Sequence, residues 1–358
     1  MSGLSSRMGI PARRVPVGQE CPTCNENGPA SELPSMSTQT ARLTGFCVSL
    51  QDVRESAERI RNHIIRTPLI RAESLDSELG CSVLLKCENM QHGHAFKARG
   101  ACNAVFSLTD EEASRGVVTH SSGNHAAALA RAAGLRDIPA HIVMPHNSAR
   151  VKLEAVRRFG VKPLLCEPNS AAREAMAAEV QQQTRATMIH PFNDPRVIAG
   201  QGTSALEILE QAPQINTLIV PVGGGGLLAG TLIVVKSLRP DIRVIAAEPT
   251  WADDAQRSLR SGKIEPALRT DSIADGLRTP LGTLTFPIIQ SLVDDILCAD
   301  EDAIVEATRM LAIRAKVVAE PSGAVPLAVI LQHTEQFAGR TVAVLISGGN
   351  LDDVRLLM

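Results

Sequence analysis

The sequence predicts an α/β fold with a mainly parallel sheet, and three observations support this prediction. Short apolar runs recur along the chain, and most are continuous rather than alternating, as in strands that are buried on both faces. Amphipathic stretches of about 10 to 16 residues separate many of these runs, which is the βα repetition of parallel sheets. The chain of 358 residues is 44% hydrophobic, enough for one large α/β domain or two smaller ones.

The folded part is expected to start near Phe46. Residues 1–45 are rich in Ser, Pro, Gly, Thr and Asn and show no apolar period, so they are predicted to be a disordered N-terminal extension. Ser49 is placed to cap a helix, which Thr67 and Pro68 then stop. The strands predicted after this helix are residues 83–85, 117–118, 141–144, 163–165, 188–189, 217–222, 244–247 and 342–346. Loops that follow such strands form the ligand sites of parallel sheets.

Composition excludes several classes of function. The 36 Lys and Arg residues and 38 Asp and Glu residues leave a formal net charge of −2, which gives no support for binding nucleic acid or a membrane surface. Tyr is absent, so no phenol can act as an acid or a base. No apolar leader or membrane-spanning run is found, and we expect a cytoplasmic protein. Most cysteines are expected to be buried free thiols, whereas Cys21 and Cys24 are either half of a zinc site or two thiols of a flexible tail.

The strongest local motif is a run of four glycines, Gly223, Gly224, Gly225 and Gly226, between a buried strand and an expected helix. The backbone N–H groups of such a loop can converge on an oxyanion, and the helix N-terminus adds positive potential. The loop matches neither the dinucleotide-binding fingerprint nor the Walker loop. We interpret it as a phosphate cradle, since four glycines are conformationally costly if they form only a tight turn.

A second anion site is predicted at residues 119–125, which precede an Ala-rich helix. Hydroxyl groups, an amide and free backbone N–H groups meet at this helix start, which suits a carboxylate, although an ordinary helix cap explains the same residues. Only seven of the 36 basic residues are lysine, and Lys97 lies in a glycine-flanked loop beside Phe96. An amine in a partly apolar, electropositive loop has a lowered pKa and can form an imine.

The other lysines have simpler explanations. Lys152 and Lys316 are predicted at solvated helix positions, and Lys86 at the end of a strand. Together, a phosphate cradle, a carboxylate site and a reactive lysine fit pyridoxal 5′-phosphate acting on an amino acid.

In these motifs the sequence resembles the fold-type II pyridoxal-phosphate enzymes, and within them the serine racemase and serine/threonine dehydratase family. The resemblance spans about residues 46–350, with the motifs in the family's order. The matching segments are residues 96–101, 121–125, 190–192, 198–203, 223–226, 247–249, 274–276, 320–321 and 347–350.

The resemblance implies roles for particular residues. Lys97 would carry the cofactor as an imine, and Ser122 would face it across the cofactor plane. Ser122 could then be the second base that racemisation needs, or only a hydroxyl that binds the carboxylate. The implied cofactor-binding residues are Phe96, Lys97, Asn124, Gly223, Gly224, Gly225, Gly226 and Ser347. The implied substrate-binding residues are Ser121, Ser122, Gly123, Asn124 and His125.

A metal site and one departure from the family complete the implied site. Glu248, the carbonyl of Ala252 and Asp254 match the family's site for Mg²⁺ or Ca²⁺, although the acidic pair could equally start a helix. Family members usually have Gly-Ser before the Phe-Lys pair, and His94 and Ala95 stand there in this chain. Substrate preference is therefore open, with His94 either an extra group near the site or an exposed loop residue.

The implied fold is the tryptophan synthase β-like fold, with two domains of mainly parallel twisted sheets flanked by helices. Residues 46–115 and 194–358 would form a large cofactor-binding domain, and residues 116–193 a small mobile domain that closes over the substrate. The expected activity is L-serine/L-threonine dehydration to a 2-oxo acid and ammonia. Alternatives are serine racemisation, alone or in the same protein, and then 3-hydroxyaspartate dehydration. A non-catalytic cofactor carrier and a nicotinamide oxidoreductase are weaker options. A homodimer or higher homo-oligomer is expected.

Overall fold

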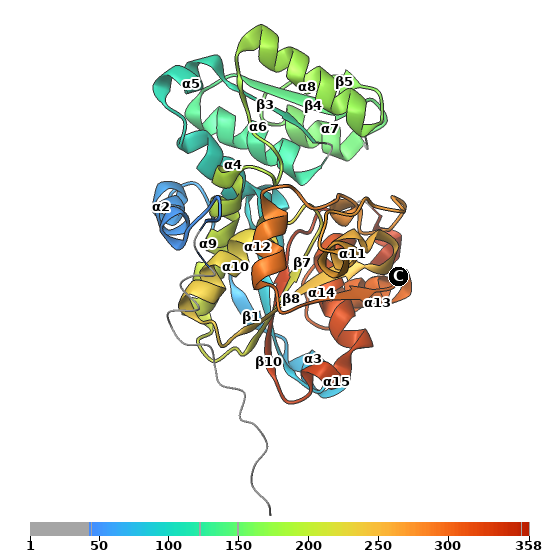
Figure 1. Ribbon diagram of the computed structural model, residues 1–358. Helices are drawn as coiled ribbons and strands as arrows, with labels where there is room; N and C mark the ends of the chain where they lie inside the picture. Colours follow the sequence, from blue (N-terminus) through green and yellow to red (C-terminus); the bar gives the residue numbers. More distant parts are fainter. Residues whose placement is uncertain (1–42, 44, 122, 149, 352, 358) are drawn as a thin grey trace, which may run out of the picture.

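The protein is built on two β-sheets, one above the other in Figure 1. The computed structural model describes residues 43, 45–121, 123–148, 150–351 and 353–357. The larger sheet has six strands in the order β1-β2-β10-β7-β8-β9, and the smaller sheet has four in the order β5-β4-β3-β6. Strand β1 pairs with β2 in the antiparallel direction, and every other pairing is parallel. The predicted α/β fold with mainly parallel sheets is confirmed.

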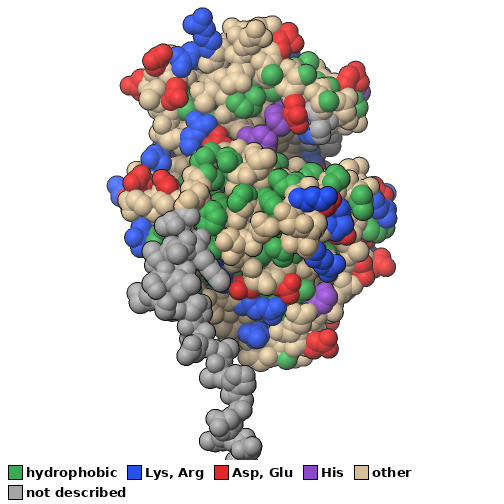
Figure 2. Space-filling model, in the orientation of Figure 1, with side chains coloured by type: hydrophobic (Ala, Val, Ile, Leu, Met, Phe, Trp, Pro, Cys, Tyr) green, Lys and Arg blue, Asp and Glu red, His purple; other side chains and the backbone are tan. Residues whose placement is uncertain are grey.

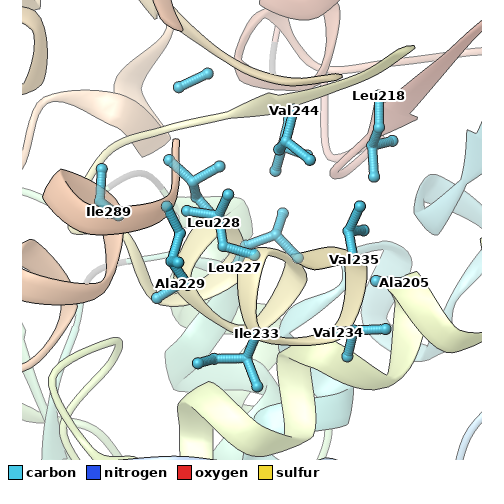
Figure 3. Packing of buried hydrophobic residues seen from close by; sticks show 14 of the residues in the cluster. Ala205, Leu218, Leu227, Leu228, Ala229, Ile233, Val234, Val235, Val244 and Ile289 are labelled. Atoms are coloured by element: carbon cyan, nitrogen blue, oxygen red, sulfur yellow. The ribbon is translucent and has the colours of Figure 1, made fainter. Parts of the chain in front are cut away.

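The larger sheet is covered on both faces, as the continuous apolar runs predicted. Side chains of successive residues point to opposite faces of a strand, so Leu218 and Val220 join one apolar cluster while Ile219 joins the other. Figure 3 shows the first cluster, in which Leu218 and Val244 of the sheet face Val235 of a covering helix. The strands are β1 (Leu69–Arg71), β2 (Ser82–Cys87), β7 (Thr217–Pro221), β8 (Arg243–Pro249), β9 (Asp295–Ala299) and β10 (Thr341–Ile346).

Helices cover both faces of the larger sheet. Helices α9 and α10 approach backbone to backbone, because a Cβ atom on Gly230 would lie 2.4 Å from the carbonyl oxygen of Ile198. The helices packed with the first cluster are α2 (Leu50–Ile60), α9 (Pro195–Gln211), α10 (Gly226–Leu238), α11 (Asp254–Ser261) and α12 (Thr285–Leu292). Those packed with the second are α3 (Glu73–Leu79), α13 (Glu301–Ile313), α14 (Pro321–Gln332) and α15 (Thr334–Phe337).

The smaller sheet has its own two apolar clusters. Val117 and Ile142 point into one, and Val118 and Val143 into the other. Its strands are β3 (Val117–His120), β4 (Ala140–Pro145), β5 (Leu164–Cys166) and β6 (Thr187–Met188), flanked by α5 (Asp110–Arg115), α6 (Asn124–Arg136), α7 (Arg150–Arg157) and α8 (Ser170–Thr184). Helix α4 (Lys97–Phe106) packs against both α6 and α9, and so joins the two sheets (Figure 1).

The first helix begins where the sequence predicted. The Ser49 hydroxyl accepts from the Asp52 N–H group, and the Asp52 carboxylate accepts from the Ser49 N–H group, a reciprocal capping box. The helix ends at Ile60 rather than continuing to Thr67. Short 3-10 turns are η1 (Glu88–Met90), η2 (His92–His94), η3 (Thr250–Ala252), η4 (Asp275–Leu277) and η5 (Val354–Leu357).

Some predictions fall outside the described residues, and some elements were missed. The predicted extension lies almost wholly outside them, as does the Cys21–Cys24 pair. Strands β1 and β9 were not predicted, because both are edge strands with partly exposed, mixed sequences. Among the described helices, none has both the length and the apolar character required to cross a bilayer.

Candidate active site

A cavity of about 250 Å³ lies between the two sheets. Residues just past the carboxyl ends of β3, β7 and β10 line it, at Ser121, Gly223 and Ser347. This is the position at which parallel α/β sheets bind ligands. Figure 2 shows histidine side chains gathered in the waist between the two parts of the molecule. The cavity brings together the motifs that the sequence had singled out from distant parts of the chain.

Lys97 lies at the base of this cavity as the first residue of α4. Its ammonium nitrogen donates to the carbonyl oxygen of Pro191 at 2.9 Å and lies 5.0 Å from the centre of the Phe96 ring. Burial lowers the pKa of Lys97 to about 8. At pH 7, roughly one amine in ten is then neutral and nucleophilic, far more than for a solvated lysine.

Backbone hydrogen bonds join the segment that precedes Lys97 to the segment that follows β10. The N–H group of Phe96 donates to the Ser347 carbonyl at 3.0 Å, and Gly349 donates to the carbonyl of His94 at 2.9 Å. Between these two bonds Ala95 and Gly348 form an antiparallel bridge. The lysine is therefore positioned by residues about 250 places further along the chain.

The unusual residues before Lys97 occupy different environments. Ala95 is buried, whereas His94 is exposed and does not line the cavity. His94 has a φ angle of +57°, in the left-handed region that favours glycine. This gives a physical reason for the glycine that the family usually has at this place.

Asn124, at the start of α6, is held from two sides. Its side-chain nitrogen donates to Oε1 of Glu320 at 2.8 Å, and its Oδ1 accepts from the Asn350 side-chain nitrogen at 2.9 Å. Asn350 also donates to the Gly93 carbonyl at 2.9 Å. Because the side-chain nitrogen of Asn350 can only donate, Oδ1 of Asn124 must face it, and the NH₂ group must face Glu320. The second hydrogen of that NH₂ group has no acceptor among the described residues, so a ligand can take it.

The tetraglycine loop forms one wall of the cavity. A Cβ atom on Gly224 would lie 2.3 Å from the Phe192 ring, and Gly225 has a φ angle of +86°. Among the described residues, the N–H groups of Gly224, Gly225 and Gly226 donate to no carbonyl or side chain. They lie at the N-terminus of α10, where the helix dipole favours an anion.

The predicted carboxylate site lies opposite, where β3 leads into α6. The N–H group of Ser121 donates to the Val143 carbonyl at 3.1 Å. Ser122 lies outside the described residues. The N–H groups of Asn124 and His125 donate to no other described residue. The His125 ring faces inward, with Nε2 3.4 Å from the Ile189 carbonyl, and burial holds its pKa well below the usual value. His125 therefore offers its backbone to an anion, and not a charged ring.

Two neutral histidines and two cations line the outer part of the cavity. Nδ1 of His190 accepts from the Asn193 N–H group at 3.0 Å, and burial lowers the pKa of His190 to about 4. The ring of His120 lies edge-on to it at 5.3 Å, and burial also lowers the pKa of His120. The cations are Lys152 and Arg173, neither of which was assigned a site role from the sequence.

The predictions for the other lysines need correction. Lys152 lies on α7, but it lines the cavity and forms an ion pair with Asp275 of η4 across the two parts of the molecule. Lys316 lies outside any helix with a φ angle of +60°. Lys86 is the penultimate residue of β2, near the strand end as predicted, but it is wholly buried and donates to Glu207 at 2.6 Å. Local sequence could not show these partners, since each is far away along the chain.

A buried ionic network fixes the first turn of α4. Arg99 is wholly buried and donates to Glu88 at 2.8 Å and to Glu207 at 2.7 Å. Because Lys86 also donates to Glu207, two cations and two carboxylates compensate one another in a largely buried network. Arg99 lies two residues after Lys97, so the network restrains the helix end from which the lysine projects.

The predicted metal site contains two buried carboxylates. Glu248 in β8 accepts from the N–H groups of Ala255 and Gln256 at 2.8 and 2.9 Å. Both carboxylate oxygens of Asp254 are buried and have no hydrogen-bond partner among the described residues. Burial raises the pKa of Glu248 well above its usual value and that of Asp254 to about 6. The described residues hold no cluster of three or more His, Cys, Asp or Glu side chains arranged for a metal.

Two residues near the site carried no predicted role. Glu320 had been noted only as part of a matching Glu-Pro pair, yet it lines the cavity and contacts Asn124. Thr285 is wholly buried and bonds the carbonyl of Gly224 at 2.8 Å. For Glu320 the sequence offers a local signal, a carboxylate just before a helix-starting proline. No local signal indicates a role for Thr285.

Comparison with known proteins adds to this geometry. The model of a family described as "Pyridoxal-phosphate dependent enzyme" matches residues 60–348. A serine racemase from Oryza sativa subsp. indica is 45% identical over 317 residues, which are 87% of this chain and 94% of that protein. A beta-hydroxyaspartate dehydratase from Paracoccus denitrificans is 46% identical over 307 residues, 86% of this chain and 98% of that protein. The structure of maize serine racemase aligns with a TM-score of 0.85 at 45% identity, covering 87% of this chain and 96% of that one.

Proposed function

This chain belongs to the pyridoxal-phosphate dependent enzymes, and from that premise we propose that it is an ammonia-lyase for L-serine or L-threonine. The observation that carries the proposal is the partly buried amine of Lys97 in one cavity with a glycine-rich anion cradle and with the first N–H groups of α6, which donate to no other described residue. The products would be a 2-oxo acid and ammonia. The net reaction leaves water unchanged, because the water released with the β-hydroxyl is consumed in forming the oxo acid.

The residues present fit the cofactor. Gly223 to Gly226 would hold its phosphate, Asn124 its ring hydroxyl and Ser347 its ring nitrogen, with Phe96 beside the ring. When bound, the cofactor supplies an electron sink that makes the α-proton of an amino acid acidic. The neutral hydroxyl of Ser347 does not hold a proton on the ring nitrogen as a carboxylate would, which favours loss of a β-substituent over a long-lived carbanion.

The remaining residues of the site would act on the substrate. The N–H groups at the start of α6 bind its carboxylate, and the Lys97 amine takes the α-proton on one face. Elimination needs no second base, because the β-hydroxyl leaves after that proton is removed. The ion pair between Lys152 and Asp275 joins the two parts of the molecule over the cavity, consistent with closure of residues 116–193 on the substrate.

Serine racemisation is the second candidate, in the same protein or in place of elimination. The serine racemases named among the relatives support it. The reaction requires a second group that returns a proton from the opposite face, and Ser122 is the residue proposed for that step.

Dehydration of 3-hydroxyaspartate is the third candidate. Lys152 and Arg173 line the outer cavity, where the second carboxylate of such a substrate would lie. The relative named beta-hydroxyaspartate dehydratase supports this option.

We also propose that Glu248, Asp254 and the carbonyl of Ala252 hold Mg²⁺ or Ca²⁺. The two buried Asp254 oxygens, which have no hydrogen-bond partner in the described part of the chain, fit a cation, and carboxylate and carbonyl oxygens are the ligands that such ions prefer. Only two acidic side chains take part, so water would complete the shell. The role would be structural or activating, since no step above needs a Lewis acid. The cytoplasmic location and the homodimer or higher oligomer remain predictions.

One experiment separates these activities. The parent protein and a Ser122→Ala variant are incubated with L-serine, L-threonine and 3-hydroxyaspartate, and 2-oxo acids and amino-acid enantiomers are measured. Oxo acid from the parent identifies a lyase, D-serine identifies a racemase, and neither product favours a cofactor carrier. Ser122→Ala is expected to abolish racemisation and keep most of the elimination. Equal loss of both would show that the selective role of Ser122 is wrong.

A further inference from the structure

The peptide group between Gly224 and Gly225 is held from outside the cavity. The carbonyl oxygen of Gly224 accepts from the Thr285 hydroxyl at 2.8 Å and from the N–H group of Gly282 at 3.3 Å. Thr285 is the first residue of α12 and is wholly buried. Its hydroxyl oxygen also accepts from the Gly282 N–H group at 2.9 Å, which fixes the rotamer of the side chain.

This contact orients the next N–H group. In a trans peptide the C=O and N–H bonds point in opposite directions, and the described residues contain no cis peptide. Because the carbonyl of Gly224 points toward α12, the N–H group of Gly225 must point away from it. Gly225 lines the cavity, and its N–H group has no protein acceptor among the described residues.

The loop itself has little preference for this orientation. Glycine adopts positive and negative φ angles at similar cost, so a run of four glycines can rotate its peptide groups easily. A phosphate that bound to a mobile loop would have to order it, and the entropy lost would weaken binding. A hydroxyl that fixes one central peptide group removes part of that cost.

The turn that carries Thr285 is itself fixed. The Asn193 side chain accepts from the Leu284 N–H group at 2.8 Å and donates to the Thr283 hydroxyl at 3.1 Å. The neighbouring Phe192 packs on Gly224, and the Pro191 carbonyl receives the Lys97 amine. One segment, residues 191–193, therefore supports both the glycine loop and the lysine.

From these contacts we propose that Thr285 is a positioning residue that preorganises the tetraglycine loop for a phosphate monoester. The inference rests on the proposed function in taking that monoester to be the phosphate of pyridoxal phosphate. The inference goes beyond the proposed function, because it attributes the fixed conformation of the tetraglycine loop to a side chain outside the cavity.

The test compares Thr285→Val with the parent in binding pyridoxal phosphate and pyridoxal, which lacks the phosphate. Dissociation constants come from absorbance titrations of cofactor-free protein. Loss of one oriented, charge-assisted hydrogen bond is expected to weaken pyridoxal phosphate binding about tenfold and to change pyridoxal binding less than about twofold. Inorganic phosphate should also raise the melting temperature of the parent more than that of the variant.

The control is Thr308→Val, at another wholly buried threonine. Among the described residues its hydroxyl bonds only its own helix, at the Ile304 carbonyl 2.8 Å away. It should leave the ratio of the two dissociation constants unchanged. If Thr285→Val does not fold, Thr285→Ser and Thr285→Ala are compared in the same titrations. Both variants lose the methyl group, and only serine keeps the hydroxyl. Serine should bind the phosphate form about as the parent does, and alanine about tenfold more weakly.

Two results would overturn the inference. One is unchanged pyridoxal phosphate binding in Thr285→Val or Thr285→Ala, and the other is an equal loss of pyridoxal phosphate and pyridoxal binding, which indicates a general structural role. A parent protein that binds neither compound overturns the proposed function as well. Binding by the parent with no effect of Thr285 leaves the proposed function intact.

Discussion

Asn350 donates a hydrogen bond to Oδ1 of Asn124 at 2.9 Å, although 226 residues separate the two along the chain. This bond sets the orientation of the Asn124 amide, whose nitrogen then donates to Glu320 at 2.8 Å. Asn124, Glu320 and Asn350 form a chain of hydrogen bonds at the edge of the cavity, which we call the relay. The relay connects the start of α6 to the segments before α14 and after β10.

The relay predicts that Glu320→Ala and Asn350→Ala weaken the binding of pyridoxal phosphate, because Asn124 then loses the partner that orients it. A loss of about five- to tenfold is expected, equivalent to about one hydrogen bond. Glu320→Gln keeps an acceptor for Asn124 and should stay close to the parent. The control is Asn89→Ala, since Asn89 donates to the nearby Val318 carbonyl at 2.9 Å and, in the described structure, makes no hydrogen bond to Asn124, Glu320 or Asn350. Equal binding by Glu320→Ala and the parent would contradict this account.

The lowered pKa of Lys97 predicts how covalent capture of pyridoxal phosphate depends on pH. Burial favours the neutral amine, so the pKa falls from 10.5 to about 8. Below that pH the amine is mostly protonated and cannot attack, and above it the amine is mostly neutral. The capture rate of cofactor-free protein, followed by stopped-flow absorbance, should rise with pH and level off above about 8. A rate that continued to climb toward pH 10.5 would mean that the amine is solvated.

The left-handed conformation of His94 predicts a stabilising substitution. A residue with a side chain is strained at a φ angle of +57°, and glycine is not. His94→Gly should therefore raise the free energy of unfolding by about 0.5–1 kcal/mol, after allowance for the greater entropy of glycine in the unfolded chain. His94→Ala keeps a Cβ atom and should give no such gain. Thermal or urea unfolding measures both, and the explanation fails if alanine stabilises as much as glycine.

The carboxylate oxygens of Asp254 have no hydrogen-bond partner within the residues that the structure describes, which predicts that the protein responds to divalent cations. After treatment with a chelator, addition of Mg²⁺ or Ca²⁺ at about 100 times its Kd should raise the melting temperature by about 5 °C. Asp254→Asn should lose this response. The neighbouring Asp253 pairs with Arg257 at 2.8 Å instead, so Asp253→Asn is the matched control and should keep it. A response that survives in Asp254→Asn would place the cation elsewhere.

Local patterns predicted much of the fold. Continuous apolar runs identified the buried strands, Ser49 identified the first helix start, and the four glycines pointed to one wall of the cavity. The missed strands β1 and β9 are edge strands with mixed sequences, whereas the errors at Lys86 and Lys152 depend on partners remote in sequence. Lys86 of β2 is buried because Glu207 of α9 compensates its charge. The roles inferred for Glu320 and Thr285 likewise arise from contacts that only the folded chain creates.

The central claim is that Lys97 holds pyridoxal phosphate covalently, and borohydride reduction followed by peptide mapping tests it most directly. The reagent converts the carbon–nitrogen double bond to a stable single bond, so the label stays on its lysine through digestion. The account predicts one labelled peptide, the one that contains Lys97, and its loss in Lys97→Arg. A label on another lysine of the cofactor-saturated protein, or no label, would contradict it.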